Sequence, residues 1–236
     1  MSTIATNIAK VGARIREAAQ AVARDPDEVQ LLAVSKTQPA DALRQASAAG
    51  QRDFGENYLQ EALEKQADLS DLPLIWHFIG PIQSNKTKLI AEHFDWVHSV
   101  DRLKIAQRLS DQRPPELGPM NICLQVNVSG EASKSGCDPQ DVPELAYAIA
   151  ALPRLHLRGL MTIPEPIDDP SEQRAAFSRL RQLQSDLELE LDTLSMGMSQ
   201  DLEAAIAEGA TWVRIGTALF GARAYPPQAA PDSPCE

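Results

Sequence analysis

A lysine that follows a short apolar run is the first residue in this sequence that could carry out chemistry. The run covers residues 31–35 and leads into Lys36, and strand alternation would place Leu32, Val34 and Lys36 on one face. Desolvation lowers the pKa of an ammonium group, and a neutral amine can attack a carbonyl to form a Schiff base. The alternative is a strand-end lysine whose amine simply extends into solvent.

Two later segments have the composition of phosphate-binding loops. The seventh apolar run leads into Ser199, just before an expected helix, and the eighth leads into Gly216 and Thr217. Glycine allows close backbone approach, and a helix N-terminus offers unpaired N–H groups at the positive end of the helix dipole. The alternative is that Ser199 only caps a helix and that Gly216 and Thr217 only form a turn. Taken with the lysine, the two loops indicate one ligand that carries both a phosphate and an aldehyde.

Arg214 is expected to point inward just below the second loop, because it shares strand parity with Gly216. A buried arginine keeps its charge and needs an acceptor. That acceptor is either a structural group of the protein or a ring nitrogen of the ligand.

Eight short apolar runs alternate with longer amphipathic segments, and these elements must position the candidate residues. This alternation predicts an α/β fold, a (β/α)₈ barrel whose working face lies at the C-terminal ends of the strands. An open doubly wound sheet is the alternative, but the glycine-rich turn that usually follows its first strand is missing. The apolar runs cover residues 31–35, 53–55, 74–80, 96–100, 122–128, 155–161, 191–196 and 212–215.

Periodicity and capping residues predict the helices. An extra N-terminal helix is indicated by apolar residues at steps of three, four or seven, namely Ile4, Ile8, Val11, Ile15 and Val22. Starts or caps of later helices are expected at Pro39, Ser84, Asp101 and Ser199, and helix ends at Gly50 and Gly209.

The composition excludes several classes of function. The 236 residues include 33 acidic and 22 basic side chains, for a net charge of −11. This balance argues against binding to nucleic acid or to anionic lipid, and an aromatic content of 5% argues against a stacking platform for single strands. No apolar run approaches the length of a membrane span. One barrel domain is expected over residues 1–223, with a disordered proline-rich tail over residues 224–236.

The cysteines and histidines favour a reduced, cytoplasmic protein without a metal. Cys123, Cys137 and Cys235 are widely spaced and form no CxxC pair. The four histidines lack the spacing of common metal-binding motifs. We expect most of these histidines to make ordinary hydrogen bonds, and we expect the chain to be a monomer.

Six sequence blocks in a fixed order resemble one known family. The chain is similar to the pyridoxal-phosphate homeostasis proteins, which bind pyridoxal 5′-phosphate and are related to the barrel domain of bacterial alanine racemase. The resemblance runs from the first helix to about Arg223. The blocks are AVSKT at 33–37, FGENY at 54–58, HFIGPIQSNK at 77–86, LRGLM at 157–161, LSMGMS at 194–199 and VRIGT at 213–217.

The resemblance implies a role for each candidate residue. Lys36 would hold pyridoxal 5′-phosphate as an internal aldimine, and Ser199, Gly216 and Thr217 would hold its phosphate. Arg214 would face the pyridine nitrogen, and Asn57 would lie beside the ring. A secondary role in cofactor exchange is considered for Lys134, for which an exposed loop lysine is the alternative.

Arginine opposite the ring nitrogen disfavours turnover, because arginine only donates and leaves that nitrogen unprotonated, which weakens carbanion stabilisation. Related racemases take a second acid–base group from a separate domain of the partner subunit, and we expect no such domain in this chain. The resemblance therefore implies a carrier without robust turnover that helps to regulate the supply of the cofactor and amino- and keto-acid balance. Its recipients would be enzymes that depend on the cofactor. The alternatives are a racemase that uses the cofactor and a class I Schiff-base aldolase.

Overall fold

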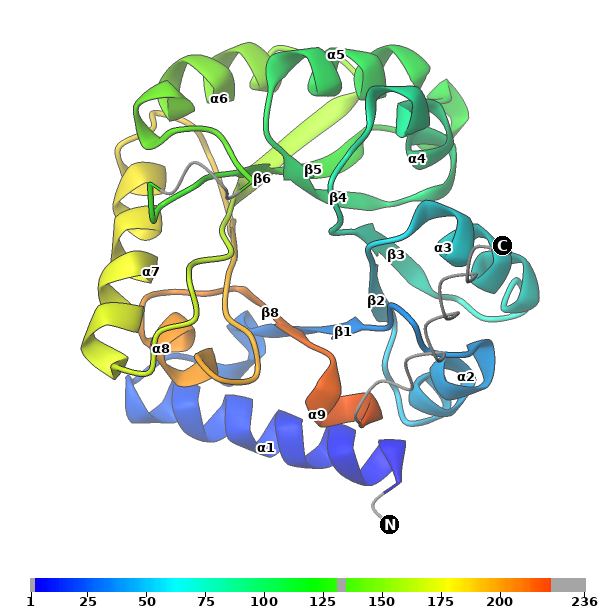
Figure 1. Ribbon diagram of the computed structural model, residues 1–236, viewed down its shortest axis with the longest axis vertical. Helices are drawn as coiled ribbons and strands as arrows, with labels where there is room; N and C mark the ends of the chain where they lie inside the picture. The colour runs from blue at the N-terminus through cyan, green and yellow to red at the C-terminus, as the bar shows by residue number, and fades with distance from the viewer. Residues whose placement is uncertain (1–2, 131–134, 222–236) are drawn as a thin grey trace, which may run out of the picture.

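Eight parallel strands form a closed barrel in the computed structural model, which describes residues 3–130 and 135–221 (Figure 1). The strands pair in chain order, and β1 pairs with β8 as well as with β2, which closes the sheet. The predicted (β/α)₈ barrel is therefore confirmed. The strands are β1 (Gln30–Val34), β2 (Asp53–Glu56), β3 (Ile75–Phe78), β4 (Trp96–Val100), β5 (Met120–Gln125), β6 (Leu155–Met161), β7 (Thr193–Ser195) and β8 (Trp212–Ile215).

The helices form an outer ring around the barrel (Figure 1). The extra N-terminal helix α1 lies along the outside of the ring and packs against α2, α8 and α9. No helix in the described part of the chain is long and apolar enough to span a membrane. The helices are α1 (Ile4–Ala21), α2 (Ala40–Ala48), α3 (Leu59–Asp68), α4 (Thr87–His93), α5 (Leu103–Gln112), α6 (Val142–Ala150), α7 (Pro170–Ser185), α8 (Leu202–Ala207) and α9 (Thr217–Phe220).

The apolar stripe of α1 is shorter than the sequence predicted. Val11 and Ile15 are buried as expected, and Ala19 extends the buried face by one turn. Val22 is instead 39% exposed, because the helix ends at Ala21 and Val22 is its C-cap.

Helix boundaries follow the glycine and proline signals more closely than the polar caps. Pro39 precedes α2 as predicted, and Gly50 and Gly209 follow α2 and α8 with φ of 98° and 97°. Ser84 does not cap α4 directly, because a 3₁₀ turn (Ser84–Lys86) comes first. Asp101 does not cap α5, because the N-cap position is Arg102, whose guanidinium donates to the Asp101 carboxylate at 2.8 Å.

The apolar core lies mainly between the barrel and the helices, and it includes the fully buried rings of Phe54, Phe94 and Phe177. Polar and charged side chains are also buried in the strands, among them His77, His98 and Arg214. A barrel of this kind usually fills its interior with branched apolar side chains. The buried polar groups of these strands therefore need an explanation beyond packing.

Candidate functional site

Lys36 and Asn57 leave two adjacent strands at the same end of the barrel. Val34 of β1 lies opposite Gly55 of β2, and the Ser35 N–H donates to the Gly55 carbonyl at 3.0 Å. Two residues beyond that pair come Lys36 and Asn57, both of which are half-buried. The Oδ1 atom of Asn57 is buried and has no hydrogen-bond partner. Such an atom is satisfied when a ligand donates to it.

A buried cluster of ionic side chains lies behind this turn. The Nζ atom of Lys65, on α3, donates to the Ser35 carbonyl at 2.8 Å, to Glu56 Oε1 at 2.8 Å and to Glu61 Oε1 at 2.5 Å. The side chains of Lys65 and Glu56 are 6% and 0% exposed. Burial raises the pKa of Glu56, and the charge of Lys65 opposes that rise. The ion pair therefore offsets part of the cost of burying this carboxylate.

The same cluster holds the backbone on both sides of Lys36. Glu61 Oε1 accepts from the Thr37 N–H at 2.5 Å, and the Ser35 hydroxyl donates to Glu56 Oε1 at 2.6 Å. Thr37 has a φ of 63°, a left-handed conformation that is unfavourable for a β-branched residue. The hydrogen bond that Glu61 accepts from Thr37 therefore stabilises a strained turn that carries Lys36. Sequence reasoning missed this cluster, because Glu61 and Lys65 have the ordinary spacing of a surface pair on a helix.

The loop after β8 lies against the end of β1. Leu32 pairs with Arg214, which places Gly216 level with Val34. A Cβ atom added to Gly216 would lie 3.2 Å from the Val34 carbonyl oxygen, so glycine permits this close approach. Thr217 begins the short helix α9 and is exposed. The predicted phosphate loop and the predicted Schiff-base lysine thus belong to neighbouring strand ends.

Ser199 lies in a turn rather than at a helix N-terminus, which corrects the sequence prediction. Helix α8 begins at Leu202, and Asp201 occupies the position before it. The Asp201 carboxylate accepts from the Met198 N–H at 2.5 Å and so closes a turn around Ser199. The Arg14 guanidinium, on α1, donates to the Ser199 carbonyl at 2.8 Å. The turn occupies residues 199–201, where the sequence predicted the first residues of the helix.

Arg214 lies inside the barrel and is 4% exposed. Its guanidinium donates through Nη1 to Ser195 Oγ at 2.9 Å and through Nη2 to the Thr162 carbonyl at 2.8 Å. Its backbone N–H donates to the Gly197 carbonyl at 2.9 Å, which joins the loop after β7 to β8. Burial lowers the pKa of Arg214 to about 10, so the side chain remains a cation at neutral pH.

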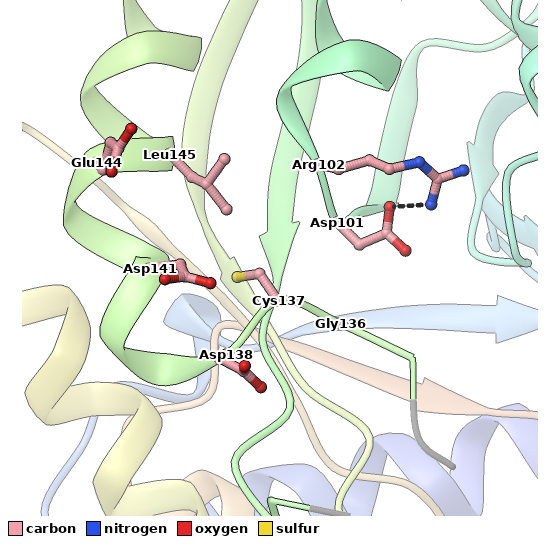
Figure 2. Close-up of a pocket in the computed structure, with 8 residues that line it drawn as sticks. All are labelled: Asp101, Arg102, Gly136, Cys137, Asp138, Asp141, Glu144 and Leu145. Carbon is pink, nitrogen blue, oxygen red and sulfur yellow. Dashed lines mark hydrogen bonds and ion pairs between the residues drawn. The ribbon is translucent and has the colours of Figure 1, made fainter. Parts of the chain in front are cut away.

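An acidic pocket of about 450 Å³ lies at the ends of β4 and β5, on the other side of the barrel from β1 and β8 (Figure 2). Four carboxylates line it, and such a surface repels a phosphate, so it is not the predicted site. Lys134 and the tail over 224–236 lie outside the described residues. The lining residues are Asp101, Arg102, Gly136, Cys137, Asp138, Asp141, Glu144 and Leu145.

Comparison with known proteins first defines the class of barrel. Residues 6–224 match the family model described as "Alanine racemase, N-terminal domain". Alanine racemase from Corynebacterium glutamicum is 20% identical, with a TM-score of 0.68 over 93% of this chain and 61% of that chain. At this identity the likeness concerns the fold alone, and the protein has a barrel of the alanine racemase N-terminal type.

Closer relatives then define the family. The "Pyridoxal phosphate homeostasis protein" of Pseudomonas aeruginosa is 76% identical over 225 residues, which cover 95% of this chain and 98% of that protein. The protein of the same name from Escherichia coli is 53% identical over 231 residues, covering 95% and 99%. The chain therefore belongs to the pyridoxal phosphate homeostasis protein family, as its sequence blocks indicated.

A relative with lower sequence identity has a solved structure with the cofactor bound. PipY of Synechococcus elongatus with pyridoxal phosphate bound is 43% identical, with a TM-score of 0.82 over 93% of this chain and 100% of that chain.

Proposed function

We propose that this protein binds pyridoxal 5′-phosphate through Lys36 and serves the homeostasis of that cofactor. The observation that carries the proposal is the placement of Lys36, Asn57 and Gly216 on neighbouring strand ends. Family membership and the cofactor bound to PipY support the choice of ligand.

The residues of this end of the barrel fit the chemistry of the cofactor. The amine of Lys36 would add to the aldehyde and release water, which forms a Schiff base. Backbone N–H groups at the start of α9 have no partner within that helix, so Gly216 and Thr217 suit the phosphate, with Ser199 from the facing loop. The buried Oδ1 of Asn57 is free to accept from a donor beside the ring.

The position of Arg214 favours storage and release of the cofactor over turnover. Arginine stays charged and only donates, so it leaves a pyridine nitrogen unprotonated. A carboxylate at that position would instead accept a hydrogen bond from the ring nitrogen, keep that nitrogen protonated and make the ring a strong electron sink. We infer that the protein regulates cofactor supply and thereby amino- and keto-acid balance, with cofactor-dependent enzymes as recipients.

An absorbance titration tests this proposal. Addition of pyridoxal 5′-phosphate to the purified protein should produce a near-visible Schiff-base band, and Lys36→Ala should abolish it. Lys88→Ala is the matched control, because the Lys88 side chain is 69% exposed on α4. Borohydride reduction followed by peptide mapping should place the label on Lys36. A label elsewhere would refute the assignment, and racemisation of alanine at ordinary enzyme rates would refute the absence of turnover.

A further inference from the structure

A continuous chain of hydrogen bonds crosses the barrel and ends on Arg214. Asp53 Oδ1 lies 3.0 Å from His77 Nε2, and His77 Nδ1 lies 2.9 Å from His98 Nε2. His98 Nδ1 lies 2.8 Å from Ser195 Oγ, which also accepts from Arg214 Nη1 at 2.9 Å. The five side chains come from β2, β3, β4, β7 and β8 in turn.

The chemistry of the two ends sets the direction of every bond in this chain. A carboxylate only accepts, so the proton on His77 lies on Nε2 and points to Asp53. Burial lowers the pKa of both histidines, and a neutral imidazole carries one proton, so His77 Nδ1 accepts from His98 Nε2. By the same step, His98 Nδ1 accepts from the Ser195 hydroxyl. Arginine only donates, so Ser195 accepts from Arg214 and all donors point toward Asp53.

The reverse direction is unfavourable. It would require a proton on Nδ1 of each histidine and would leave the bare Nε2 of His77 facing the Asp53 carboxylate. The Asp53 side chain is 21% exposed at the N-terminal end of β2, so its carboxylate is in contact with solvent. The partly hydrated anion thus fixes the tautomers of two histidines whose rings are fully buried.

Aromatic side chains hold these imidazole rings in place. The ring of His77 stacks on Trp96 with a centroid distance of 5.5 Å and an interplanar angle of 8°. Trp212 lies against the same ring, with a centroid distance of 4.9 Å. The second donation of Arg214, to the Thr162 carbonyl, fixes the other arm of its guanidinium. Two hydrogen bonds therefore hold the guanidinium, and the one to Ser195 depends on the series of bonds that begins at Asp53.

We propose that Asp53, His77, His98 and Ser195 are positioning residues that orient the Arg214 guanidinium toward the ring of the bound cofactor. The anchor of this chain lies at the end of the barrel opposite Lys36. The inference rests on the proposed function for the identity of the ligand, whereas the direction of the chain follows from the protein alone.

The first test needs no cofactor. In protein labelled with ¹⁵N-histidine, long-range proton–nitrogen spectra should show neutral Nε2–H tautomers for His77 and His98, each assigned by its own His→Gln variant. In Asp53→Asn, whose amide can either donate or accept, the His77 tautomer should become mixed. An Nδ1–H tautomer at either position in the unmodified protein overturns the proposal. A role limited to packing would leave the tautomers unchanged in Asp53→Asn.

The second test measures the dissociation constant of pyridoxal 5′-phosphate by absorbance. Ser195→Ala removes the hydroxyl that accepts from Arg214, and loss of one such bond predicts about three- to tenfold weaker binding. Asp53→Asn should also raise the dissociation constant of the cofactor. Ser110→Ala is the matched control, because Ser110 is a 1% exposed serine on α5 that takes no part in this series of hydrogen bonds. The dissociation constant of this variant should stay within about twofold of that of the unmodified protein.

The outcomes separate the two proposals. If Ser195→Ala binds the cofactor as tightly as Ser110→Ala, the positioning role is refuted while the proposed function stands. If the unmodified protein does not bind the cofactor, the proposed function is refuted. The tautomer spectra then still decide the direction of the chain.

Discussion

Removal of the Lys65 ammonium should destabilise the protein strongly and in a manner that depends on pH. In Lys65→Met the side chain keeps most of its length but lacks the terminal amine, so Glu56 loses the cation that lies 2.8 Å away. The Ser35 carbonyl and Glu61 lose a donor at the same time. The variant therefore leaves a carboxylate buried in the protein without its counter-charge.

The burial of the pair sets the size of the effect. Lys65 and Glu56 are 6% and 0% exposed, and loss of one partner of a buried pair costs about 3–5 kcal/mol. Glu61 is 28% exposed, so solvent screens its share and it adds little. For a chain of this length, the loss corresponds to a fall in Tm of about 6–20 °C.

The sign of the pH dependence follows from Glu56. Burial already raises its pKa, and loss of the Lys65 charge raises it further. A carboxyl group whose pKa is higher in the folded state destabilises that state at pH values above the unfolded pKa, and the penalty is lost as the pH falls through the folded pKa. The loss of stability in Lys65→Met should therefore be largest at neutral pH. It should become smaller as the pH falls toward about 4.3, the ordinary pKa of glutamate.

Urea unfolding, followed by circular dichroism between pH 5 and pH 8, measures this deficit. The control Lys88→Met breaks an exposed pair with Glu92 and should change the free energy of unfolding by less than about 0.5 kcal/mol. Adding Glu56→Gln to Lys65→Met should recover much of the loss, since no buried charge remains. A deficit below about 1 kcal/mol, or one that does not vary with pH, would show that this reasoning is wrong.

Three further predictions concern other parts of the molecule. Gly216→Ala places a Cβ atom 3.2 Å from the Val34 carbonyl oxygen, so it should lower stability by about 1–3 kcal/mol in urea unfolding and weaken cofactor binding by absorbance. Burial raises the pKa of Cys123 and Cys137 to about 12, so iodoacetamide at pH 8 should label both only after unfolding, as peptide mass mapping will report. Arg14→Ala removes an ion pair whose side chains are 37% and 53% exposed, and urea unfolding should show a loss of about 1 kcal/mol or less.

Some boundaries of the barrel could be predicted closely because the signal is local. The apolar runs 96–100, 155–161 and 212–215 coincide with β4, β6 and β8 residue for residue. The run 191–196 is longer than β7 (Thr193–Ser195), because strand bounds are set by pairing with neighbours as well as by apolar composition. Ser199 was misplaced for a similar reason, since the bond between Asp201 and Met198 is a feature of the folded loop.

Periodicity, turn residues and local motifs were enough to predict the order of strands and helices, the family and the inward direction of Arg214. The surroundings of Lys36 and Arg214 could not be predicted in this way, because they come from distant parts of the chain. Lys65 lies 30 positions from Ser35, whose carbonyl it binds beside Lys36, and His98 lies 97 positions from Ser195. Closure of the sheet brings such residues within hydrogen-bond distance, and burial then makes each charge depend on its partner.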